Sequence, residues 1–131
     1  MPSTPTARIV DWLRKALVDM PSEIRMVYVE SCEYVTPAPE YQTVAHYDMF
    51  GFHRIPGGGF EPDNNDHVGE LGCWDWQASS DCAFPDIPFD ACDWLQLLET
   101  AVRDSSVVVL LRRRETILLF ADHDGPVSVV R

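Results

Sequence analysis

Apolar residues recur with helical spacing near the start of the chain. Thr4 and Pro5 suit a helix start, because Thr can accept hydrogen bonds from free amides and Pro tolerates the first helical position. Pro21 ends the pattern. The sequence therefore predicts one amphipathic helix between these residues. We expect its apolar stripe to pack on a sheet. The stripe consists of Ile9, Val10, Leu13, Ala16, Leu17 and Met20.

β-Branched and aromatic residues dominate the segments that follow this helix. Residues 24–35 and 43–52 are rich in Val and Tyr and predict two strands that pair antiparallel. Residues 71–78 predict a third strand, in which Trp74 and Trp76 share one face because side chains alternate along a strand.

The last third of the chain predicts a second helix followed by short strands. Asp90 is a candidate N-cap, and Phe89 and Trp94 have the placement of a hydrophobic staple around it. A meander of three strands is predicted at residues 106–111, 116–121 and 127–130.

This order of elements predicts a single α+β domain over residues 1–131. It has two layers, with an antiparallel sheet of about five to six strands and two helices packed on one face (order α-β-β-β-α-β-β-β). A chain of 131 residues suits one hydrophobic core. Residues 53–70 and 79–89 are rich in Pro and Asp and predict long exposed acidic loops.

Acidic residues are concentrated in the middle of the chain. The net charge is −11, and from Met26 to Val102 fourteen acidic residues stand against one basic residue, Arg54. Nucleic acid and anionic lipid are bound through Lys and Arg, so this balance disfavours both and favours a basic protein partner. We interpret the one basic cluster, residues 112–114, as a solubilising turn rather than a nucleic-acid contact.

The first eight residues are polar and lack the apolar run of a secretory signal, and the aliphatic run at residues 107–111 is too short to cross a bilayer. We therefore expect a cytoplasmic protein. In that reducing compartment cysteines remain thiols, and we expect this of Cys32, Cys73, Cys82 and Cys92.

Close ligand pairs of the kind found in zinc sites are missing from the sequence. The last three cysteines are nine and ten residues apart, whereas zinc ligands usually come two to four apart. Residues 63–66 (Asp-Asn-Asn-Asp) resemble part of a calcium loop, but the positions that need Gly and an acid hold Val68 and Trp74. We expect no metal and no other cofactor.

Catalysis has one candidate group. His46 and Asp48 lie on one face of the second predicted strand and His53 follows, so a general base with an orienting carboxylate can be assembled. No recognised nucleophile motif accompanies them, and the three glycines at 57–59 lack the Lys or helix of a phosphate-binding loop. We predict no catalytic residues.

Acidic loops that flank aromatic residues can attract a basic protein and then anchor it. A solvated acidic surface without a partner is the alternative interpretation. The predicted partner-binding carboxylates are Asp63, Asp66, Glu70, Asp75, Asp81 and Asp86.

In size, acidity and single-domain character, the chain resembles the small acidic antitoxin and immunity proteins that bacteria pair with toxins. The resemblance implies a non-enzymatic inhibitor that binds and neutralises a basic protein such as a toxin domain. No motif carries it, so it assigns no residue. The sequence leaves open a type III secretion effector chaperone, then a nucleic-acid mimic, then a small-molecule enzyme, and it does not decide between monomer and dimer.

Overall fold

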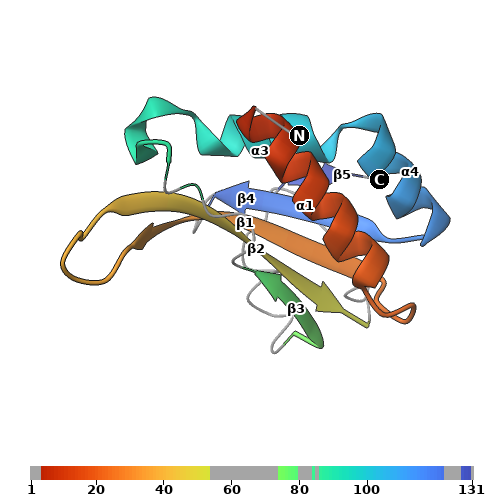
Figure 1. Cartoon of the computed structure of the whole chain (residues 1–131). Helices are drawn as coiled ribbons and strands as arrows, with labels where there is room; N and C mark the ends of the chain where they lie inside the picture. The colour runs from red at the N-terminus through yellow and green to blue at the C-terminus, as the bar shows by residue number, and fades with distance from the viewer. Residues whose placement is uncertain (1–3, 54–73, 80–83, 85, 123–127, 131) are drawn as a thin grey trace.

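The computed structural model describes residues 4–53, 74–79, 84, 86–122 and 128–130. In this part of the chain, three α-helices pack against a five-stranded sheet and lie on the same side of it (Figure 1), so the predicted α+β class is confirmed. The elements are α1 (Pro5–Asp19), β1 (Met26–Val35), β2 (Thr43–Phe52), β3 (Trp76–Ser79), the 3₁₀ turn η1 (Phe89–Ala91), α3 (Trp94–Val102), α4 (Ser105–Arg113), β4 (Ile117–Asp122) and β5 (Ser128–Val130).

The sheet has the strand order β3-β2-β1-β4-β5. β1 and β2 pair antiparallel, as predicted, and so do β2 with β3 and β4 with β5. β4 lies parallel to β1, so the sheet is mixed rather than wholly antiparallel as predicted. Parallel neighbours need a crossover between them, and α3 and α4 lie in that connection.

The first helix forms as the sequence predicts. The Thr4 side chain accepts a hydrogen bond from the backbone amide of Ala7 at 3.1 Å, and Pro5 is the first helical residue. The helix ends before Pro21. Its buried residues face the sheet and are Ile9, Trp12, Leu13, Ala16 and Leu17.

Residues 106–111 are helical, so the prediction of a strand there is wrong. They belong to α4, whose N-cap Asp104 accepts a hydrogen bond from the amide of Ser106 at 2.9 Å. Val107 and Leu111, four residues apart, are the buried positions of this helix. The cap and this packing outweigh the strand preference of consecutive valines.

The helix predicted to begin at Asp90 begins later. Asp90 lies in the 3₁₀ turn η1, and the extended backbone of Cys92 separates that turn from α3. Asp93 is the N-cap of α3, because its side chain accepts a hydrogen bond from the amide of Gln96 at 3.1 Å. Trp94 still contacts Phe89, since its indole nitrogen donates to the carbonyl oxygen of Phe89.

Trp74 and Trp76 lie on opposite faces of the sheet, which corrects the prediction that they share one. Regular alternation starts only at Trp76, the first residue of β3. Trp76 packs against the core under the helices. The Trp74 ring lies 4.7 Å from the ring of Phe50, on the other face.

Both faces of the sheet carry buried apolar residues. The larger core lies between the sheet and the helices and includes Leu17, Met49 and Leu98. The opposite face has a smaller group of buried residues: Met26, Tyr28, Phe52, Leu119 and Ala121. Among the described residues, none of the helices combines the length and the apolar character needed to span a lipid bilayer.

Candidate functional site

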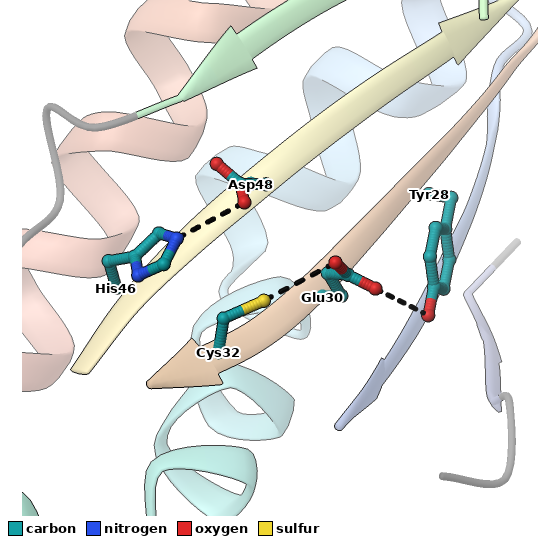
Figure 2. A network of polar contacts seen from close by, with 5 residues as sticks. All are labelled: Tyr28, Glu30, Cys32, His46 and Asp48. Atoms are coloured by element: carbon teal, nitrogen blue, oxygen red, sulfur yellow. Dashed lines mark hydrogen bonds and ion pairs between the residues drawn. The ribbon is translucent and has the colours of Figure 1, made fainter. Parts of the chain in front are cut away.

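Four polar residues form a two-by-two array where β1 and β2 pair, on the face that the helices leave uncovered. Glu30 lies opposite Asp48 and Cys32 lies opposite His46 in the strand register (Figure 2). Directly opposite side chains in an antiparallel pair have Cβ atoms about 4.5–5.5 Å apart. The register therefore gathers a thiol, an imidazole and two carboxylates in a small area.

The contacts within this array are short. His46 Nε2 lies 3.2 Å from Asp48 Oδ2, and the Cys32 thiol donates to Glu30 Oε1 at 3.3 Å (Figure 2). The second oxygen of Glu30 accepts a hydrogen bond from the Tyr28 hydroxyl, also at 3.3 Å. Ligand atoms of Cys32, His46 and Asp48 all lie within 4.8 Å of one another.

The Cys32 thiol is strongly held in its protonated form. Burial is the main cause that raises the pKa of Cys32 far above its usual range, followed by the charge and the hydrogen bond of Glu30. The charges of Asp48 and Asp122 act in the same direction. A thiolate is the reactive form of cysteine, so this environment does not suit a cysteine nucleophile.

His46 has incomplete hydrogen bonding within the described part of the chain. Its side chain is 21% exposed, and its Nδ1 atom is buried with no hydrogen-bond partner there. The edge of the ring packs against Tyr34, with ring centroids 6.0 Å apart. The ring is therefore fixed by packing against Tyr34 and by the contact of its Nε2 with Asp48.

An acidic depression lies beside the array, beyond the last residue pair of β1 and β4, which is Ser31 with Asp122. Its volume is about 710 Å³. Strand alternation puts Glu33 on the helix side and Cys32 on the other side, so the depression reaches round the edge of β1 that β4 leaves unpaired. We call it the acidic depression; its lining is Ser31, Cys32, Glu33, His46, Asp48, Phe89, Asp90, Cys92, Asp93, Trp94, Leu95 and Asp122.

Charge distinguishes this depression from the groove between α1 and α4 in the described structure. Five of its lining residues are acidic and none is Lys or Arg. The groove between α1 and α4, of about 580 Å³, mixes both signs. The charged residues of that groove are Asp11, Arg14, Lys15, Asp19 and Arg113.

Two of the six predicted partner-binding carboxylates lie in the described residues, and neither lines the acidic depression. Asp86 is paired with Arg8, whose guanidinium nitrogen lies 3.0 Å from one carboxylate oxygen. A hydrogen bond from its own backbone amide and the bond from Arg8 lower the pKa of Asp86. Arg8 also lies over the ring of the buried Phe84, at 4.4 Å. The other four, Asp63, Asp66, Glu70 and Asp81, lie outside the described residues.

The candidate catalytic group is divided between two places. His46 and Asp48 are in contact, as their spacing on one strand predicts. His53 pairs with Asp75 instead: the backbone amide of His53 donates to Asp75 Oδ2 at 2.8 Å, and its Nδ1 lies 3.7 Å from Oδ1. His53 does not line the acidic depression.

Sequence reasoning missed Cys32 as a neighbour of His46, although the signal was present. If the last residue of the first predicted strand, Val35, pairs with the first residue of the second, Thr43, then Cys32 falls opposite His46, as observed. The depression residues Asp90 and Asp93 come from the segment before α3, and Asp122 comes from the end of β4. Only the packing of α3 and β4 against β1 brings those together.

Cys32 and Cys92 are free thiols, while Cys73 and Cys82 lie outside the described residues.

Comparison with known proteins found no matching family model, no matching curated protein and no matching solved structure.

Proposed function

We propose that this chain is a non-enzymatic binding protein of the immunity or antitoxin type, which neutralises a basic protein by binding it at the acidic depression. The observation that carries the proposal is the lining of that depression, with five carboxylates and no Lys or Arg among the described residues. Such a surface is complementary to a segment rich in Lys and Arg.

Four of these carboxylates are exposed and face solvent from three directions: Glu33 on β1, Asp90 and Asp93 before α3, and Asp122 at the end of β4. A concave surface of one charge sign concentrates the field and raises the rate at which an oppositely charged partner arrives. Rapid capture of a toxin is what an inhibitor of this type requires.

Apolar residues in the same depression supply contact area once a partner has arrived. Phe89 and Leu95 are partly buried beside the carboxylates and supply this area, whereas Trp94, at 4% exposed, belongs to the core beneath the helices. Apolar and aromatic residues at the centre of an interface with charged residues around them are typical of protein–protein contacts. The hydrogen bonds from Trp94 to Phe89 and from Gln96 to Asp93 hold this segment in place before binding. Because the segment is already ordered, less conformational entropy is lost when a partner binds.

The loop carboxylates predicted from the sequence extend this proposal beyond the described residues. Asp63, Asp66, Glu70 and Asp81 lie in the same acidic middle of the chain and remain predicted contacts. We expect Asp86 to contribute less to binding, because its carboxylate is already paired with Arg8. The cytoplasm, where free thiols persist, is the proposed compartment.

Affinity capture from native lysate tests the proposal, with three baits at low and at high salt. The baits are the wild type, the double variant Glu33→Lys with Asp90→Lys, and Asp19→Lys. Asp19 is exposed and lies in the mixed-charge groove, so Asp19→Lys changes a charge of the same sign away from the site. We expect one basic protein on the wild type and on Asp19→Lys, lost from the double variant and lost at high salt.

Each other pattern would count against the proposal. A protein retained equally by all three baits would place the binding surface elsewhere. Empty captures at low salt would remove the support for a basic protein partner. Dimerisation of the purified chain together with capture of unfolded client segments would favour the secretion-chaperone alternative.

A further inference from the structure

The polar array on β1 and β2 has the composition of a metal site. We propose that Cys32, His46 and Asp48 bind one divalent transition-metal ion, with Zn²⁺ the best match to the three ligand types. This goes beyond the proposed function, because it concerns a cation held by the chain itself rather than a protein partner. Sequence spacing did not indicate it, since the ligands come from two strands and not from one close pair.

The distances fit a single ion with little movement. The three ligand atoms lie within 4.8 Å of one another, and His46 Nε2 lies 3.2 Å from Asp48 Oδ2. Tetrahedral zinc with its usual bond lengths of about 2.0–2.3 Å separates ligand atoms by about 3.4–3.6 Å. Side-chain rotations that move the ligand atoms by roughly 1 Å would therefore bring all three into the coordination sphere of one ion.

The ligand types favour zinc over calcium and magnesium. Thiolate and imidazole are ligands of borderline-soft metals, whereas calcium and magnesium prefer oxygen ligands alone. Three protein ligands leave the fourth tetrahedral position for water or for an incoming group. Because these three residues also line the acidic depression, that fourth position is accessible from it.

The charges around the three ligands suit a cation. Glu30 lies beside Cys32 and opposite Asp48, and Asp122 also acts electrostatically on Cys32. Among the residues that line the acidic depression there is no Lys or Arg to offset these carboxylates. On binding, the metal–sulfur bond replaces the S–H bond of Cys32, and the proton passes to solvent.

The backbone holds the ligands before any ion arrives. Cys32 and His46 are paired residues within a ladder that runs without a break from Met26 with Phe52 to Val35 with Thr43. His46 and Asp48 are two residues apart on β2, so both point to the same face. A site on two hydrogen-bonded strands is more precise than one on loops.

Zinc titration of the metal-free protein tests the site, with Co²⁺ as a spectroscopic probe. We expect one bound Zn²⁺ per chain by elemental analysis after dialysis, and a sulfur-to-cobalt charge-transfer band that reports Cys32. Cys32→Ser should remove that band and weaken Zn²⁺ binding more than about 100-fold, because even loss of an outer-shell partner costs 10–100-fold. The matched control is Cys92→Ser, a second cysteine of the acidic depression outside the ligand set, which should leave both unchanged.

Folding is checked on the metal-free variants by circular dichroism and urea unfolding. If Cys32→Ser does not fold, Asp48→Asn keeps the shape of the side chain and carries the same test, with weaker Zn²⁺ binding expected. The proposal is overturned if the wild type binds no Zn²⁺, or if Cys32→Ser and Asp48→Asn both bind it as tightly as the wild type. Capture of a basic protein by the metal-free chain would be unaffected by that failure, so the two proposals are tested separately.

Discussion

Cys32 and His46 lie directly opposite each other in the antiparallel pairing of β1 and β2. On the same face, the carboxylate of Glu30 contacts Cys32 and the carboxylate of Asp48 contacts His46. The pair therefore sits within negative charge, which keeps the thiol of the metal-free chain protonated. A bound cation would offset that charge and stabilise the thiolate. The wider acidic depression extends the same charge preference to the end of the sheet.

The hydroxyl of Tyr47 joins the sheet to the start of α3. It is buried and donates a hydrogen bond to the backbone carbonyl of Trp94 at 2.6 Å. Tyr47→Phe should lower the free energy of unfolding by about 1–3 kcal/mol, because the buried carbonyl loses its donor. Urea unfolding measures this, with Tyr41→Phe as control, since Tyr41 is 69% exposed. Equal stability of the two variants would mean that water replaces the lost donor.

Arg114 secures the end of α1, a role that differs from the solubilising turn predicted for the basic cluster. One of its terminal nitrogens donates to the backbone carbonyls of Met20 and Pro21. Arg114→Ala should lower the free energy of unfolding by about 1.5–3 kcal/mol, the range for hydrogen bonds to charged groups. Arg112→Ala and Arg113→Ala, at exposed positions in the last turn of α4, should each cost less than about 1 kcal/mol. Thermal or urea unfolding of the three variants would refute this role if their losses were equal.

Asp104 should make stability depend on acid pH. Hydrogen bonds from the Ser106 hydroxyl and amide lower the pKa of Asp104, so its ionised form stabilises the fold. This contribution is fully present above the unfolded pKa of about 3.9 and is lost as pH falls through the lowered folded pKa. Asp104→Ala should cost about 1 kcal/mol at neutral pH and progressively less below about pH 4. A difference in unfolding free energy that stays constant down to the lowest pH would contradict this assignment.

The fold was predictable where local chemistry and packing agree. Thr4, Pro5 and Pro21 delimit α1 in the sequence and in the structure. The antiparallel pairing of the two long strands follows from their alternating pattern. Residues 106–111 were mispredicted because their valines favour a strand locally, while the Asp104 cap and the burial of Val107 and Leu111 favour a helix.

The candidate site was predictable only in part. His46 and Asp48 are on one strand, so their contact follows from alternation alone. To predict that Cys32 lies beside His46, one needs the register of the two strands, and that register depends on the loop between them. The carboxylates of Asp90 and Asp122 reach the same depression through tertiary packing. The spacing of residues along the sequence does not predict that contact.

The most direct test of the proposed function is the association rate of the captured basic protein with purified variants, measured by stopped flow at low and high salt. Glu33→Lys with Asp90→Lys should slow association at least tenfold at low salt and change the dissociation rate much less, because these charges act mainly during approach. Asp63→Lys with Asp66→Lys tests the loop in the same assay, and Asp19→Lys is the control. If the Glu33 and Asp90 double variant associates at the wild-type rate, the acidic depression is not the binding surface.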